Sequence, residues 1–122
     1  MQIYENMIRT IQGPFWVLVF LLSPLIAHSA ELLMIEEPGC VYCARFNHEI
    51  GPAYPNTAEG KLAPLRRLQL ADPWPATLSQ VRKATVTPTF ILVENGKEVE
   101  RLIGYPGDEH FWFLLGQMLQ KL

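Results

Sequence analysis

Two cysteines, Cys40 and Cys43, stand three positions apart in the run Cys-Val-Tyr-Cys. Residues at this spacing lie on neighbouring turns of one helix face, so two such thiols can close a disulfide. Pro38 and Gly39 directly before Cys40 predict that a helix begins at this point. Free backbone N–H groups and the helix dipole stabilise a thiolate there, so we expect a lowered pKa for the Cys40 thiol. The pattern predicts thiol–disulfide exchange, with Cys40 attacking and a shielded Cys43 resolving the mixed disulfide.

Two other uses of the cysteine pair stay open at this point. A purely structural disulfide closing so short a loop would stabilise the fold by about 2 kcal/mol, against about 3 kcal/mol for fifteen residues. A metal site needs two further ligands, and His48 lies on the wrong side of the predicted helix to converge with Cys40. We therefore favour redox chemistry and expect no bound metal and no separate cofactor. An electron relay or metallochaperone role in cytochrome or copper-site assembly would use the same cysteines.

A strand and a helix that would position the cysteines are visible in the sequence. Residues 32–35 form a continuous apolar run, typical of a strand that is covered on both faces. After Cys43, Phe46 and Ile50 recur at helical spacing and form one buried stripe. The helix is expected to end at Gly51-Pro52, because proline disfavours helical geometry in the residue before it.

The rest of the chain predicts alternating strands and helices. We expect a helical turn capped by Asn56 with Glu59, strands over 65–70, 89–93 and 98–103, a short helix over 76–84 and an amphipathic helix over 111–122. Asn95-Gly96 predicts a type I′ hairpin turn. Helical crossovers give parallel strands and the hairpin gives an antiparallel pair. The order β-α-β-α-β-β-α therefore predicts an α/β fold with a mixed four-stranded sheet and helices on both faces.

A Thr-Pro pair stands directly before the most apolar predicted strand. Proline cannot donate a hydrogen bond within a central strand, so Pro88 at this position needs an explanation. A cis peptide bond between Thr87 and Pro88 would supply one, since such bonds are turn features. An ordinary trans proline at the start of a strand is the alternative.

The N-terminal residues differ in composition from the rest of the chain. Residues 15–27 form an uncharged, mostly apolar run, shorter than the roughly 20 residues of a bilayer span and typical of a signal peptide. Ala27-His28-Ser29 offers small residues for cleavage before Ala30. We expect a signal peptide, or an uncleaved N-terminal anchor, over 1–29 and a single domain over 30–122. Export to the periplasm would place both cysteines in an oxidising compartment.

Composition narrows the possible partners. The chain has 122 residues with 49% hydrophobic and 18% charged, which indicates one folded domain. A net charge of −2 without a basic run argues against nucleic-acid binding, which needs clustered Lys and Arg. We expect a monomer that acts on the disulfides of partner proteins.

The pairing of a Cys-x-x-Cys helix start with a later Thr-Pro and an Asn-Gly hairpin resembles the thioredoxin superfamily. This resemblance implies a thioredoxin-like fold of the minimal kind, a thiol–disulfide oxidoreductase activity and a redox-active disulfide between Cys40 and Cys43. It further implies that Cys40 is the nucleophile, Cys43 the resolving thiol and Pro88 a cis-proline. Thr87 would contact the substrate backbone, and Gly104 would let the last loop approach the site.

A narrower resemblance rests on MIEEPGCVYCARFNHEIGPAYPNTAEG and APLRRLQL, which are similar to the thioredoxin-like proteins of bacterial sulfur-oxidation gene clusters. It implies that this chain is a periplasmic reductant for the cysteine of a sulfur-carrier protein. An upstream membrane thiol reductant is the candidate partner that would reduce this chain again. Cys-x-Tyr-Cys is similar to glutaredoxins, which adds glutathione as a candidate partner. Where thioredoxins keep a buried acid, six residues before Cys40, this chain has Met34. Two alternatives stay open: either Glu36 or Glu37 substitutes for this acid, or both glutamates are solvated charges.

Overall fold

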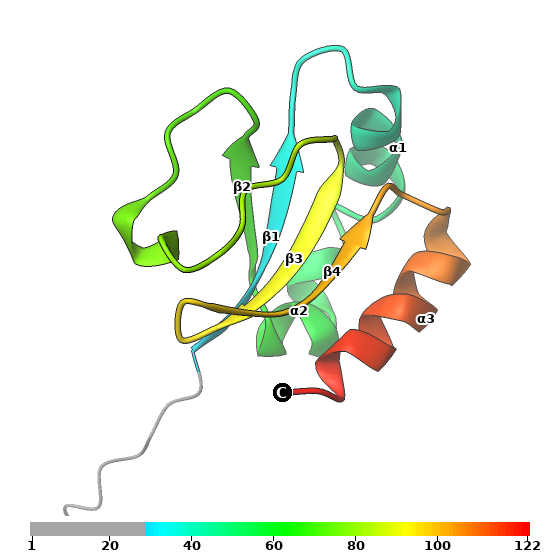
Figure 1. Ribbon diagram of the computed structural model, residues 1–122. Coiled ribbons are helices and arrows are strands. Elements are labelled where there is room, and N and C mark those ends of the chain that lie inside the picture. Colours follow the sequence, from blue (N-terminus) through cyan, green and yellow to red (C-terminus); the bar gives the residue numbers. More distant parts are fainter. Residues whose placement is uncertain (1–28) are drawn as a thin grey trace, which may run out of the picture.

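A mixed sheet of four strands forms the centre of the molecule. Residues 29–122 are described by a computed structural model, and the predicted leader lies outside them except for Ser29. The strands, in the sheet order β2-β1-β3-β4, are β1 (Ala30–Glu36), β2 (Leu65–Gln69), β3 (Thr89–Glu94) and β4 (Lys97–Ile103). β1 pairs parallel with β2 and antiparallel with β3, and β3 pairs antiparallel with β4 (Figure 1). The predicted mixed four-stranded sheet is therefore confirmed.

The two central strands are buried on both faces, as their apolar runs predict. Leu32 to Ile35 in β1 and Phe90 to Val93 in β3 are almost fully shielded from solvent. The hairpin after β3 turns at Asn95 and Gly96, whose φ angles of 53° and 78° are those that a type I′ turn requires. The hairpin fixes the register of β3 and β4 at the end of the sheet opposite to Cys40, and the buried central strands carry this register to the other end.

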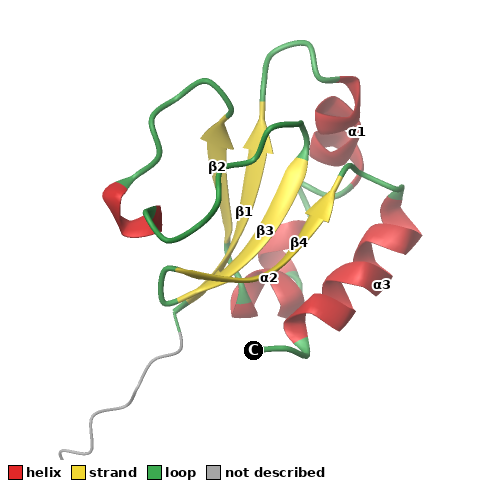
Figure 2. Ribbon diagram, in the orientation of Figure 1, coloured by secondary structure: helices red, strands yellow, loops and turns green. Residues whose placement is uncertain are grey.

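All three α-helices cover one face of the sheet. They are α1 (Val41–Glu49), α2 (Ala58–Leu62) and α3 (Asp108–Leu119), and Figure 2 shows them on the same side of the strands. Phe46 of α1 packs against Phe90 of β3 and Phe111 of α3, with ring centroids 4.8 Å and 5.1 Å away. This aromatic cluster anchors α1, and with it the cysteine pair, to the sheet. None of the helices among residues 29–122 is long and apolar enough to cross a bilayer.

The opposite face of the sheet is covered by a 3₁₀ turn and an irregular segment, where the sequence predicted a helix. The helix predicted over 76–84 is only a 3₁₀ turn, η3 (Ala76–Leu78), and the chain then runs irregularly while still burying Val81 and Ala84. η3 has no side-chain cap at its start, and the carbonyl of Arg82 accepts a hydrogen bond from Arg101 of β4 (2.7 Å). The buried residues Leu78, Val81 and Ala84 recur at every third position, a spacing that a 3₁₀ turn with an irregular continuation also satisfies, so the apolar pattern did not require an α-helix.

The capped turn after α1 also differs in one detail. Asn56 ends a 3₁₀ turn, η2 (Tyr54–Asn56), and Thr57 is the residue that caps α2. The Thr57 hydroxyl accepts from the Gly60 N–H (3.0 Å) and donates to the Tyr54 carbonyl (2.7 Å). Threonine satisfies both groups at once, so the cap lies one residue after the predicted position.

We predict opposite effects for two helical glycines. A Cβ at Gly60 would lie 1.8 Å from the Tyr54 carbonyl oxygen, whereas a Cβ at Gly116 meets no atom within 4 Å. Gly60→Ala should lower the free energy of unfolding by roughly 1–3 kcal/mol or more, because the packed turn has to shift. Gly116→Ala should raise it by about 0.5–1 kcal/mol through helix propensity. Urea unfolding measures both, and equal effects of the two changes would contradict this packing.

Candidate active site

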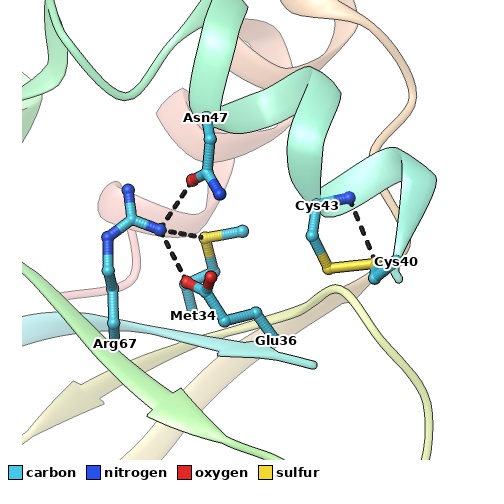
Figure 3. Close-up of polar contacts among 6 residues, drawn as sticks. All are labelled: Met34, Glu36, Cys40, Cys43, Asn47 and Arg67. Carbon is cyan, nitrogen blue, oxygen red and sulfur yellow. Dashed lines mark hydrogen bonds and ion pairs between the residues drawn. A yellow bond between two sulfur atoms is a disulfide. The ribbon is translucent and has the colours of Figure 1, made fainter. Parts of the chain in front are cut away.

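The two cysteines form a disulfide at the N-terminus of α1. Their Cα atoms are 5.2 Å apart, and Cys40 is the N-cap residue, with its Sγ accepting the Cys43 N–H at 3.1 Å (Figure 3). Cys43 is 3% exposed within the main core, whereas Cys40 is partly exposed. The pair therefore consists of one accessible sulfur on free helix N–H groups and one buried sulfur behind it.

The turn before the helix fixes the position of Cys40. β1 ends at Glu36, and Gly39 has a φ of +79°, which favours glycine because it has no Cβ. The Cys40 N–H then donates to the Glu37 carbonyl (3.3 Å), and the helix starts directly afterwards. The predicted helix start is thus confirmed.

Two further loops meet this turn at the same end of the sheet (Figure 1). The peptide bond between Thr87 and Pro88 is cis, and Pro88 is buried. The Pro88 carbonyl accepts the N–H of Gly104, whose φ is +86°, at 2.8 Å. The Thr87 hydroxyl donates to the Glu37 carboxylate, also at 2.8 Å. Hydrogen bonds therefore join the loops that carry all five residues singled out in the sequence.

Four exposed apolar side chains flank these residues in the sequence. Each stands next to a site residue, and each is between 48% and 70% exposed: Val41, Tyr42, Val86 and Ile103, here called the apolar rim. Exposed apolar groups at this density around a reactive group are typical of a docking surface. Sequence reasoning missed these four side chains. Their positions beside the cysteines, Thr87 and Gly104 were the signal that could have identified them.

A cationic cluster lies behind the disulfide, on the helix-covered face. Met34 is fully buried, and its strand register places it beside Arg67 of β2. One guanidinium nitrogen of Arg67 lies 3.4 Å from the Met34 Sδ, 2.6 Å from the Glu36 carboxylate and 2.6 Å from the Asn47 Oδ1. In Figure 3 the Met34 side chain lies between the guanidinium and the disulfide. Sequence reasoning missed Arg67, because its partners are 20 to 33 residues away.

Glu36 and Glu37 differ in their position and in their partners. Glu36 points to the face of Met34 and is paired with Arg67, whereas Glu37 lies at the exposed turn and binds Thr87. Neither glutamate occupies the space of Met34, which is filled by the methionine itself. The side chain that lies between the Arg67 cluster and the disulfide is therefore the apolar one of Met34.

A second polar cluster ties α1 to the loop after Gly104. The Tyr105 hydroxyl and the Arg45 guanidinium both donate to the Glu49 carboxylate, and Arg45 lies 5.6 Å from the centre of the Tyr105 ring. The hydrogen bond from Tyr105 is the main cause that lowers the pKa of Glu49. Burial, followed by the bond to Glu49, raises the pKa of Tyr105. This cluster holds the last site loop against the helix of the cysteines.

Metal binding has no separate site in this part of the molecule. Within residues 29–122, no three side chains of His, Cys, Asp or Glu gather in a way that would hold an ion.

Residues 27–119 match the family model of the thioredoxin-like domain. The chain belongs to this family, and with its Cys-x-x-Cys pair it is a thiol–disulfide oxidoreductase.

Among solved structures, the chain is similar to the periplasmic thioredoxin SoxS from Paracoccus pantotrophus. The two are 49% identical with a TM-score of 0.73, over 75% of this chain and 97% of that one. Trxlp from Edwardsiella tarda is 25% identical, with a TM-score of 0.55, over 71% and 82% of the two chains. A thioredoxin from Malassezia sympodialis, 16% identical with a TM-score of 0.54 over 74% and 75%, shares the fold. A comparison with curated protein sequences gave no significant match.

We predict that the Arg67 cluster stabilises the fold more than a comparable ion pair on the same two strands. Arg67→Met removes three contacts and leaves the Glu36 side chain, which is 17% exposed, without its cation. We expect a loss of about 1–2 kcal/mol in the free energy of unfolding. Arg66→Met is the matched control, since Arg66 makes a single pair with Glu31, whose side chain is more exposed than that of Glu36, and the variant should lose about 0–1 kcal/mol. Urea unfolding that ranks the two variants the other way round would contradict this assignment.

The lowered pKa of Glu49 predicts a pH-dependent contribution to stability. Its carboxylate is favoured in the folded state, so the contribution is complete above the ordinary value of 4.5 and is lost as the pH falls through the lower folded pKa. Glu49→Gln and Tyr105→Phe should therefore each lose less stability than the wild type between pH 5 and pH 3. Urea unfolding across this range measures the slope, and three parallel curves would show that the Tyr105 bond does not act on Glu49.

Proposed function

We propose that this thiol–disulfide oxidoreductase is a periplasmic reductant of protein disulfides, with Cys40 as the nucleophile and Cys43 as the resolving thiol. One observation carries the proposal: an accessible sulfur caps the start of α1 while its partner is buried one helical turn later. A thiolate at Cys40 gains from the Cys43 N–H and from the helix dipole. Burial of Cys43 keeps external disulfides away from the second sulfur.

The reaction runs through a mixed disulfide. The Cys40 thiolate attacks one sulfur of the substrate disulfide, a new S–S bond forms, and the other substrate sulfur leaves as a thiolate that takes up a proton. The Cys43 thiol then loses its proton and attacks the Cys40 Sγ, which releases the second substrate thiol. The substrate has gained two electrons and two protons, and the Cys40–Cys43 disulfide has formed. A further dithiol, such as a membrane thiol reductant, must then reduce the pair again.

Thr87, Pro88 and Gly104 are proposed to form the substrate-binding edge. The hydrogen bond between the Pro88 carbonyl and the Gly104 N–H joins their two loops beside the turn of Cys40. The residues of the apolar rim stand next to the site residues in the sequence and offer apolar contacts to a peptide. A protein segment with an accessible disulfide fits this edge better than a small polar molecule, because the rim gains most from apolar side chains.

The charges around the cysteine pair favour the reduction of substrate disulfides over their formation. Strong oxidants stabilise their reactive thiolate heavily, yet Val41 and Tyr42 bring no cation between the cysteines, and Glu37 adds a negative charge beside them. We therefore infer a reduction potential well below the roughly −120 mV of the strongest oxidants. The predicted leader and the periplasmic SoxS neighbour support the same compartment. The sulfur-carrier protein of a sulfur-oxidation system is the partner that we propose.

The proposal is tested by the reactivity of each cysteine alone. In the Cys43→Ser variant, the rate of alkylation of Cys40 by iodoacetamide should rise with a midpoint below the roughly 8.5 of a free thiol. Cys43 in the Cys40→Ser variant should react slowly because it is buried. Both variants should lose insulin-disulfide reduction on the order of a hundredfold or more, since the two thiols act as a unit.

A Cys43→Ala variant should instead keep its partner as a stable mixed disulfide on Cys40. Mass spectrometry of the trapped species would identify the partner, and the sulfur-carrier protein is the expected one. An alkylation midpoint at or above 8.5, or a Cys40→Ser variant with full activity, would overturn the proposed function.

A further inference from the structure

Glu37 holds an unusual place at the mouth of the proposed site. It stands three residues before Cys40, its backbone carbonyl accepts the Cys40 N–H (3.3 Å), and its side chain is exposed. Its carboxylate accepts the hydroxyl of Thr87 at 2.8 Å, a contact across 50 residues of sequence. The carboxylate is thereby tied to the loop that would bind the substrate, and the backbone of the same residue is tied to Cys40.

The charge of Glu37 is not neutralised locally. Other glutamates near the site have cations, since Glu36 pairs with Arg67 and Glu49 pairs with Arg45. The ion pairs formed within residues 29–122 do not include Glu37, whose side chain bonds only the neutral Thr87 hydroxyl. A fixed carboxylate without a cation projects a negative potential into the space in front of Cys40.

Exposed apolar residues flank, in the sequence, the two site residues to which Glu37 is hydrogen-bonded. The four residues of the apolar rim carry no charge and lie next to the cysteines, Thr87 and Gly104 in the sequence. A substrate group that passes over such a surface displaces water, so it meets a stronger field than in bulk solvent. The sign of the charge beside the substrate sulfur should therefore influence the rate of attack.

We propose that Glu37 is a specificity-determining residue, which selects disulfides that carry a cationic group beside the sulfur attacked by Cys40. The inference rests on the proposed function and extends it to the class of substrate. Disulfides with a carboxylate beside the sulfur are disfavoured, and so is oxidised glutathione, which carries net negative charge. A partner protein is accordingly expected to present a lysine, an arginine or a free amine near its reactive cysteine.

Small disulfides of different charge test the inference without a partner protein. The probes are cystamine, which is cationic, bis(2-hydroxyethyl) disulfide, which is neutral, and 3,3′-dithiodipropionate, which is anionic. Stopped-flow fluorescence or thiol release gives the second-order rate for the reduced protein at low and at high salt. Each charged rate is divided by the neutral rate, which removes any general change in the reactivity of Cys40.

Variants of Glu37 should change the ratios of the charged rates to the neutral rate. Glu37→Gln should lower the cystamine ratio roughly threefold to tenfold and raise the dithiodipropionate ratio by a similar factor, as expected for unit charges several ångströms apart near a surface. Glu37→Lys should shift both ratios further in the same direction, and salt should weaken every effect. Oxidised glutathione should follow dithiodipropionate. Glu31→Gln is the matched control, because Glu31 lies at the far end of β1 and should leave the ratios unchanged.

Two results would overturn the inference. If Glu37→Gln changes all rates by one common factor, Glu37 acts only on the Cys40 thiolate and not on the choice of substrate. If Glu31→Gln moves the ratios as much as Glu37→Gln, the effect belongs to net charge and not to this position. A wild-type protein that reduces none of the probes would instead refute the proposed function. Rates that are intact, with ratios insensitive to Glu37, would refute this inference alone.

Discussion

The site depends on one hydrogen bond, from the Cys43 N–H to the Cys40 Sγ, because it makes a sulfur atom the cap of a helix. Most helix caps are oxygen atoms of Ser, Thr, Asp or Asn, and a sulfur in that role is held where free N–H groups favour negative charge. The buried face of α1 keeps the helix in place, since Phe46 and Ile50 are sealed into the core. The position of the reactive sulfur is therefore a consequence of packing on the far side of the helix.

Sheet register brings the other site loops to that sulfur. Ile35 of β1 pairs with Thr89 of β3, and Thr89 pairs with Ile103 of β4, so these three residues form one row across the sheet. The chain beyond this row supplies the turn of Cys40 after β1, Pro88 before β3 and Gly104 after β4. A slip of one residue in either pairing would reverse the faces of a strand and displace a loop. Burial of β1 and β3 on both faces makes such a slip costly.

Local patterns in the sequence predicted the parts of this design that depend on near neighbours. The helix start at Cys40 follows from Pro38-Gly39, and the hairpin follows from Asn95-Gly96, because turn chemistry is encoded within a few residues. The helix expected over 76–84 rested on an apolar spacing that a 3₁₀ turn also satisfies. The unforeseen Arg67 cluster depends on contacts between distant segments. The bond between Glu37 and Thr87 is of the same kind. Periodicity identifies which side chains are buried, but it does not identify the partners of polar groups.

The distribution of charge around the disulfide divides the site into an apolar interior and an acidic mouth. Behind Cys43, the buried Met34 occupies the position of a thioredoxin acid, and the nearby cation of Arg67 is matched by Glu36. Glu37 forms no ion pair among the described residues and accepts a hydrogen bond from Thr87. Under the proposed function, the helix start would favour the thiolate of Cys40, whereas the burial of Cys43 would favour its neutral thiol. The charge of Glu37 would then act on the incoming substrate rather than on the buried sulfur.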